Sequence, residues 1–270
     1  MKSLLLQEDY SQEWVKDFYS QAGIWWGEDP QAAGVHQTRV KSVERLCGGG
    51  SKTILDLGTG PGATAAALAD AGHRVLAVEL SPTRAKFARA LAMIPRKGSL
   101  TVLEDDFYEM DIKDRFDVVC CWETFGLGTD ADQRRLLQRM AQEWLAPEGS
   151  VLMDVYNPAG PARDAGKEWR LSPLPGVPGS VEMFERCHYD PVQGRWIDEW
   201  QPTANPEGSL AQTLRCYTPA DLLLLLEGTG LRLKLIEIAG EVIDVTANRR
   251  MNNTSWFARD YNYLVQLVPE

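Results

Sequence analysis

The sequence predicts an α/β protein built on a doubly wound, mostly parallel sheet with helices on both faces. A short apolar, β-branched run, Thr53–Leu57, is followed by alternate glycines and then by an alanine-rich stretch, residues 63–71, with high helix propensity. Two further apolar runs, Arg74–Leu80 and Phe116–Cys121, resemble strands that are covered on both faces. Strand, glycine turn and helix form the first unit of such a sheet, and ligands bind where that turn opens.

The composition is that of a globular protein with an excess of acids. A length of 270 residues with 44% hydrophobic residues allows one large domain, or a domain with an inserted cap. The formal net charge of −10 argues against a broad phosphate-binding surface, so we expect no nucleic-acid partner. There is no apolar run of about 18 residues, no signal-peptide pattern and no metal-ligand spacing among the five cysteines. We expect a cytoplasmic protein with free thiols, no bound metal and no membrane association.

Aromatic residues at near-helical spacing mark the N-terminal segment. Tyr10, Trp14 and Phe18 recur along one helical face, and the run from Trp25 to Gly27 interrupts the pattern. The segment is compatible with a helix that packs its aromatic stripe on the sheet and with a lid over a ligand. We expect residues 1–46 to form an N-terminal helical lid.

Local start and stop signals place the remaining elements of the sheet. Pro82 is suited to the first position of a helix, and the prolines and glycines around residues 147–149 end another. The elements expected after Arg74–Leu80 are, in chain order, a helix over 82–94, a strand over 100–103, the Phe116–Cys121 strand, a helix over 132–145 and a strand over 150–155.

Loop signals rich in proline and glycine follow residue 156, and a hairpin pattern around residues 190–194 follows them. We expect an inserted, β-rich substrate cap over 157–215, because loops carry specificity on a constant scaffold. Thr218 and Asp221 then form a capping box that restarts the core, with strands over 231–238 and 261–268. The expected organisation is therefore a lid (1–46), a core (47–156), a cap (157–215) and a C-terminal completion of the sheet (216–270).

The glycines alone leave two nucleotide-binding interpretations open. A dinucleotide fingerprint can be laid on Gly58, Gly60 and Ala63. Asp56, two residues before the first glycine, would repel a pyrophosphate but suits a ligand that carries an ammonium group. A structural glycine turn without a ligand is the remaining alternative.

The run Asp56-Leu-Gly58-Thr59-Gly60-Pro-Gly62 resembles the acid-x-Gly-x-Gly-x-Gly motif of the class I S-adenosylmethionine-dependent methyltransferases and matches it at every fixed position. The resemblance extends over residues 35–156 and, more weakly, over 217–268. It implies a Rossmann-like sheet of seven strands, the last of them antiparallel. It also implies S-adenosyl-L-methionine as cofactor, with S-adenosyl-L-homocysteine as product.

Residue chemistry and the resemblance together supply candidates for the cofactor site. Glu79 ends the second strand about twenty residues after Asp56, where an acid accepts hydrogen bonds from ribose hydroxyls. The resemblance implies an acid on the adenine amino group after the third strand, which Asp106 or its neighbour Asp105 matches. It also implies a covering tyrosine or arginine upstream. The full expected set is Asp56, Gly58, Thr59, Gly60, Gly62, Glu79, Leu80, Asp105, Asp106, Phe107, Trp122, Trp25 and Arg39.

Methyl transfer needs little covalent help from the protein. The sulfonium methyl is a strong electrophile, so positioning and exclusion of water carry most of the rate. A hydroxyl or ammonium nucleophile must lose a proton, and a general base contributes typically about 10² to 10⁴-fold. The candidates are Glu123 after the fourth strand, His188 in the cap and Tyr19, and no spacing decides among them.

Subclass signals favour a small-molecule acceptor that is methylated on oxygen or nitrogen. Enzymes acting on amino groups of DNA bases carry Asn/Asp-Pro-Pro-aromatic after the fourth strand, where this chain has Cys121-Trp122-Glu123-Thr124. Cys120 and Cys121 lie within a strand, unlike the nucleophile of pyrimidine C5 enzymes. A protein or RNA acceptor is the alternative. A dinucleotide-dependent oxidoreductase and a non-catalytic nucleotide-binding protein are less favoured.

Overall fold

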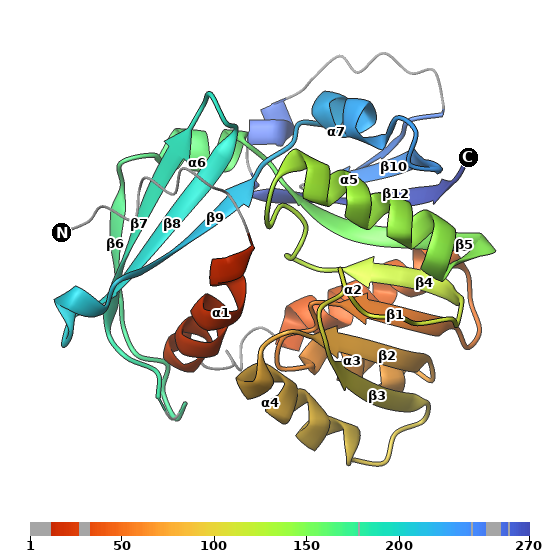
Figure 1. Ribbon diagram of the computed structural model, residues 1–270, viewed down its shortest axis with the longest axis horizontal. Coiled ribbons are helices and arrows are strands. Elements are labelled where there is room, and N and C mark those ends of the chain that lie inside the picture. The colour runs from red at the N-terminus through yellow and green to blue at the C-terminus, as the bar shows by residue number, and fades with distance from the viewer. Residues whose placement is uncertain (1–11, 27–32, 178, 239, 247–254, 259) are drawn as a thin grey trace.

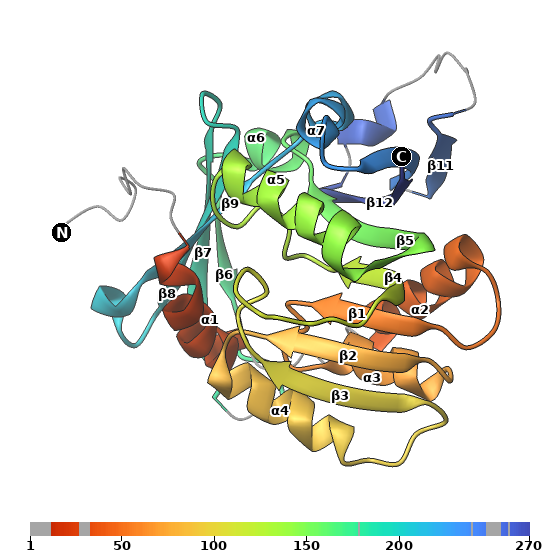
Figure 2. The same ribbon diagram turned by 45° about the vertical axis from the view of Figure 1, so that its right-hand side comes forward.

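The computed structural model of the protein describes residues 12–26, 33–177, 179–238, 240–246, 255–258 and 260–270. The strands of the larger sheet are β1 (Thr53–Leu57), β2 (Arg74–Glu79), β3 (Ser99–Glu104), β4 (Phe116–Cys121), β5 (Leu145–Tyr156), β10 (Leu231–Ile238), β11 (Glu241–Asp244) and β12 (Asn262–Pro269). Their spatial order is β11-β10-β12-β5-β4-β1-β2-β3 (Figures 1 and 2). Strands β1 to β5 are parallel, and the sheet reverses its winding between β1 and β4.

The predicted fold class is confirmed. The last strand, β12, inserts antiparallel between β5 and β10. One strand of the larger sheet was missed: β11 pairs antiparallel with β10 and adds an eighth strand at the edge of the sheet. Its four residues are mostly exposed, so it carries no hydrophobic alternation from which a strand could be predicted.

Helices cover both faces of the larger sheet. They are α2 (Ala33–Cys47), α3 (Ala63–Asp70), α4 (Pro82–Ala92), α5 (Asp130–Arg139) and α7 (Pro219–Leu226). Two more helices, α1 (Glu13–Trp26) and α6 (Ala159–Asp164), contact the second sheet described below. Helices α2 and α3 lie on one face of the sheet, and α5 and α7 lie on the other (Figure 2). Side chains of α2 and α3 pack with Ile54, and side chains of α5 and α7 pack with Leu55. Successive residues of a strand point to opposite faces, so β1 contributes to both cores. No helix in the described ranges is both long and apolar enough to cross a membrane.

The helix expected over 132–145 has different boundaries in the structure. It begins at Asp130 because Thr129 and Asp132 form a reciprocal capping box. A π-helical turn, Met140–Trp144, follows α5, and β5 begins at Leu145 instead of residue 150. The Thr-x-x-Asp signal was present in the sequence and would have placed the helix start.

A second, antiparallel sheet lies beside the first and has the order β6-β7-β8-β9. Its strands are β6 (Glu168–Leu171), β7 (Met183–Asp190), β8 (Arg195–Pro202) and β9 (Leu210–Arg215). The expected hairpin corresponds to β7 and β8, and β6 and β9 extend it on either side. Helix α1 lies between the two sheets, where it contacts β9 and α4 (Figure 1).

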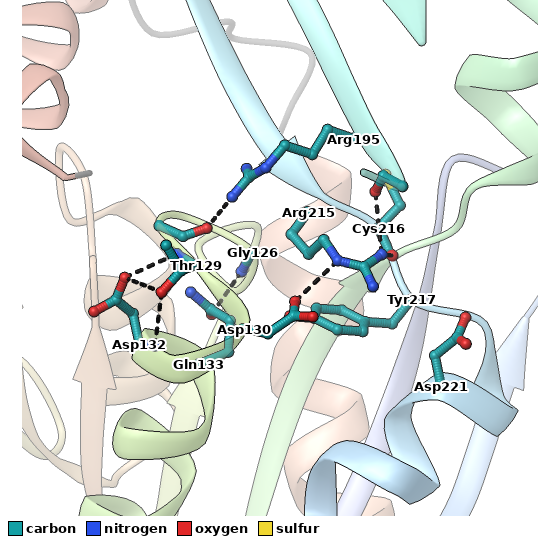
Figure 3. Close-up of polar contacts among 12 residues, drawn as sticks. Gly126, Thr129, Asp130, Asp132, Gln133, Arg195, Arg215, Cys216, Tyr217 and Asp221 are labelled. Atoms are coloured by element: carbon teal, nitrogen blue, oxygen red, sulfur yellow. Dashed lines mark hydrogen bonds and ion pairs between the residues drawn. The ribbon is translucent and has the colours of Figure 1, made fainter. Parts of the chain in front are cut away.

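Two arginines connect the smaller sheet to the loop between β4 and α5 (Figure 3). Arg195, which is 2% exposed, donates to the carbonyl of Gly128. The Arg215 Nε donates to Asp130 Oδ1 at 2.9 Å, and the Tyr217 hydroxyl donates to the same oxygen at 2.7 Å. These bonds fix the position of the smaller sheet relative to the larger one.

We expect Arg215→Ala to lower the free energy of unfolding by about 1–3 kcal/mol, because several partly buried acceptors lose their donor. Arg170→Ala is the matched control, since the Arg170 side chain is 65% exposed, against 20% for Arg215. The pair of Arg170 with Glu182 is therefore expected to contribute little to stability. Urea unfolding of the two variants measures the difference, and equal losses would show that Arg215 does not connect the sheets.

Candidate functional site

A cavity of about 530 Å³ lies where the carboxyl ends of β1, β2 and β4 face the smaller sheet. This volume is in the range of ligand-binding pockets. Its walls come from α1, α2, the turns after β1, β2, β3 and β4, and the strands β5, β7, β8 and β9. The residues that line it and were predicted as site residues are Tyr19, Arg39, Asp56, Gly58, Thr59, Gly60, Glu79, Leu80, Asp106, Phe107, Trp122 and Glu123.

The glycine turn after β1 requires positive φ angles, a backbone conformation that glycine adopts more readily than any other residue. Gly58, Gly60 and Gly62 have φ values of +66°, +61° and +88°. A Cβ on Gly58 would lie 2.5 Å from the Thr124 Oγ1. Gly62 does not line the cavity; it precedes α3, where a Cβ would lie 2.8 Å from the Cβ of Ala88, so it allows α3 and α4 to approach closely.

Gly58→Ala is expected to weaken S-adenosylhomocysteine binding at least about tenfold, because Thr124 and the turn must move apart. Gly228→Ala is the control: its φ of +72° imposes the same backbone strain, but nothing lies within 4 Å of the added methyl. Calorimetric titration measures both. Equal affinity of the two variants would show that the close contact with Thr124 has no role in shaping the turn.

Asp56 is an unusually buried acid at the carboxyl end of β1. It is 1% exposed, and its Oδ2 accepts a hydrogen bond of 2.6 Å from the Thr59 hydroxyl. Its Oδ1 is buried and receives no hydrogen bond from the part of the chain that the structure describes. Burial raises the pKa of Asp56 to about 6, against the opposing effects of Thr59 and Arg39. A cationic donor in the cavity would supply the missing partner.

Glu79, which is 5% exposed, is held in one orientation by backbone donors. Its Oε2 accepts from the Gly60 N–H and its Oε1 from the Ser81 N–H, both at 2.8 Å. Each carboxylate oxygen has a further lone pair, so the group can also accept hydrogen bonds from two ligand hydroxyls.

The turn after β3 distinguishes between two neighbouring acids. Asp106 and Phe107 line the cavity, and the Asp106 Oδ1 accepts from the Tyr108 N–H at 2.8 Å. Asp105 does not line the cavity; its Oδ1 accepts from the Asp106 N–H at 2.8 Å and stabilises the turn. Of the two predicted acids, Asp106 therefore lies in the cavity wall with Phe107, and Asp105 does not.

Arg39 connects α2 to two acids at the ends of β4 and β5. Its guanidinium lies 2.7 Å from the Glu123 Oε2, 3.2 Å from the Asp154 Oδ2 and 5.2 Å from the centre of the Trp122 ring. Burial raises the pKa of Asp154 to about 6, despite the neighbouring Arg39. Asp154 was not predicted, although an acid within the apolar β5 run was a visible signal.

The other two candidate bases differ in position: Tyr19 lines the cavity and His188 does not. Burial raises the pKa of Tyr19 well above its usual range, so its phenol stays protonated, and its hydroxyl donates to the Gln212 Oε1 at 3.0 Å. His188 lies outside the cavity, with its Nε2 3.8 Å from the Glu199 Oε2. His188 follows Glu185 on β7 by an odd number of positions, so the two side chains point to opposite faces of the smaller sheet. Glu185 is on the face that lines the cavity. Trp25, on α1, also lies outside the cavity.

The smaller sheet contributes residues that were not predicted. Trp196, Asp198 and Trp200 alternate along β8 and share the face that lines the cavity. This period-two pattern was visible in the sequence, but only the position of the sheet shows which face meets the ligand. Further lining residues that were missed include Arg84, Tyr108, Tyr156, Glu185, Gln212 and Tyr261.

The segment that contains the glycine turn is similar to known methyltransferases. Residues 54–149 match the family model described as a methyltransferase domain. A cypemycin N-terminal methyltransferase from Streptomyces sp. is 34% identical over 119 residues, which are 43% of this chain and 46% of that protein. The chain thus spans about half the length of the curated relatives that it matches.

Solved structures resemble the chain over nearly its whole length. The CcbJ methyltransferase from Streptomyces caelestis has a TM-score of 0.68 at 21% identity and covers 97% of this chain and 98% of its own. CalS10 from Micromonospora echinaspora, an amino pentose methyltransferase solved with bound S-adenosylmethionine, has a TM-score of 0.58 at 19% identity and covers 96% and 97%. These likenesses show a shared fold that includes both sheets.

Proposed function

We propose that this chain transfers a methyl group from S-adenosylmethionine to an oxygen or nitrogen of a small molecule. The match of residues 54–149 to a methyltransferase domain supports this proposal, as do the methyltransferases that the chain resembles. The observation that carries the proposal is the pair of buried acids at the glycine turn. Asp56 presents a buried oxygen without a donor, and Glu79 presents two oriented oxygens. A ligand with an ammonium group and a ribose matches both.

The residues present fit this cofactor along the length of the cavity. Asp56 would hold the ammonium group, Glu79 the ribose hydroxyls, and Asp106 with Phe107 the adenine. When bound, the cofactor supplies an electrophilic methyl group. The chain's own part is to orient the acceptor in line with that methyl group and to limit the access of water, and the smaller sheet forms one wall of the cavity.

A small acceptor is supported by the construction of the cavity. Its volume of about 530 Å³ has to contain both the cofactor and the reacting part of the acceptor. The acceptor side is formed by α1 and by the strands β7, β8 and β9, whose aromatic and acidic side chains do not resemble a phosphate-binding surface. CalS10 is described as an amino pentose methyltransferase, and an amino pentose is a small sugar.

The test is calorimetric titration of the purified protein with S-adenosylmethionine, S-adenosylhomocysteine and NAD, followed by an assay for S-adenosylhomocysteine release with a panel of small amines and alcohols. We expect both adenosyl compounds to bind, NAD not to bind, and release to depend on the acceptor. Binding of NAD alone would overturn the proposal in favour of an oxidoreductase. Binding of the adenosyl compounds without turnover, when RNA or protein acceptors are turned over, would replace the small molecule by a macromolecule.

A further inference from the structure

The side of the cavity formed by the smaller sheet holds two carboxyl groups that the cofactor contacts do not use. Asp198, on β8, is 1% exposed, and its Oδ2 accepts from the Trp200 Nε1 at 2.8 Å and from the Gln212 Nε2 at 3.1 Å. Its Oδ1 is buried and accepts no hydrogen bond from an N–H or hydroxyl group of the described residues. Glu185, on the neighbouring strand β7, also lines the cavity and lies within hydrogen-bonding reach of Asp198.

No cation within the described residues pairs with these two acids. Of the arginines that line the cavity, Arg39 is paired with Glu123 and Asp154. Arg84 lies on the cofactor side, with its guanidinium 5.3 Å from the centre of the Tyr19 ring and beside Gly60. Burial and the neighbouring Glu185 raise the pKa of Asp198 well above its usual range, and burial also raises the pKa of Glu185.

Aromatic rings surround the two acids. Trp196 and Trp200 precede and follow Asp198 on the same face of β8. The rings of Tyr156 and Tyr261 lie 5.6 and 5.1 Å from the ring of Trp196. Carboxylates and the faces of aromatic rings both attract a cation. A neutral hydroxyl ligand would leave the buried carboxylates without a compensating charge.

On the basis of the proposed function, we propose that Glu185 and Asp198 bind an ammonium group of the acceptor and so restrict this site to molecules that carry an amine. The amine would donate to the Asp198 Oδ1, and its positive charge would balance the negative charge of the two carboxylates. Trp200 and Gln212 hold the other Asp198 oxygen and so orient the carboxylate toward the cavity.

The test compares two probes that differ only in the group of interest, tyramine and tyrosol, by calorimetry on the protein saturated with S-adenosylhomocysteine. We expect tyramine to bind about tenfold or more tightly than tyrosol. Glu185→Gln and Asp198→Asn should each reduce that preference to about threefold or less. Glu199→Gln is the matched control, because Glu199 adjoins Asp198 on β8 but faces away from the cavity, with its Oε1 3.6 Å from Arg186.

The outcomes separate this inference from the proposed function. Unchanged S-adenosylhomocysteine binding in all three variants would show that the fold and the cofactor site are intact. Equal binding of the two probes to the unmodified protein, including no binding of either, would overturn the inference and leave the cofactor assignment standing. The inference would also be overturned if both Glu185→Gln and Asp198→Asn still bound tyramine about tenfold more tightly than tyrosol. If S-adenosylhomocysteine does not bind, the proposed function fails, and the same comparison on the ligand-free protein still tests the acidic pair.

Discussion

Glu79→Ala is expected to weaken S-adenosylhomocysteine binding by about a hundredfold or more. The substitution removes the acceptor that we propose for the ribose hydroxyls, and each hydrogen bond to a charged group contributes about 1.5–3 kcal/mol. It also leaves the N–H groups of Gly60 and Ser81 without their acceptor, so the turn that surrounds the ligand loses its support. A combined loss of about 3 kcal/mol corresponds to about a hundredfold in affinity. Calorimetric titration with S-adenosylhomocysteine measures it.

Glu104→Ala is the matched control for Glu79→Ala. Glu104 ends β3 directly beside Glu79, in the same register, but it pairs with Arg89 and does not line the cavity. Its removal should leave the affinity within about twofold, since exposed ion pairs contribute little. If both variants lose affinity equally, the cause is disruption of the sheet edge, and Glu79 is not the ribose ligand.

Asp56→Asn is expected to have opposite effects on binding and on stability. Cofactor affinity should fall at least about tenfold, because an amide cannot balance the ammonium charge. The ligand-free variant should be more stable than the parent at pH 7, by about 1–3 kcal/mol. The reason is the raised pKa of about 6: the unfolded chain ionises Asp56 above pH 3.8, whereas the folded chain resists ionisation until about pH 6. Ionisation therefore costs stability as the pH rises between those values and at every higher pH.

The pH dependence of binding follows from the same group. Below pH 6 the Asp56 carboxyl of the parent protein becomes protonated, so S-adenosylhomocysteine affinity should be about tenfold weaker at pH 5 than at pH 7. Asp56→Asn should lose most of that dependence. The control is Asp70→Asn, which replaces an exposed acid at the end of α3 and should leave both the affinity and its pH profile unchanged. A steep profile that persists in Asp56→Asn would assign the titration to another group, with Asp154 the first candidate.

The cofactor side of the site was largely predictable from local sequence. The glycines after β1 reflect backbone angles that few other residues adopt, and the acids Asp56 and Glu79 mark the ends of short strands. These features depend on residues within a few positions of one another, and parallel pairing of β1 with β2 then brings both strand ends to the same edge. The chain itself therefore determines the glycine turn, its two acids and the α/β class.

The acceptor side was decided only by the tertiary structure. The hairpin was predicted, but a hairpin has two faces, and local spacing does not say which one meets a ligand. Arg195 and Arg215 attach the smaller sheet to the loop after β4, far away in sequence, and this attachment directs Glu185 toward the cavity and His188 away from it. Contacts between distant segments depend on how whole sheets pack, so the residues that they bring together, Glu185 and Asp198 above all, become visible only in three dimensions.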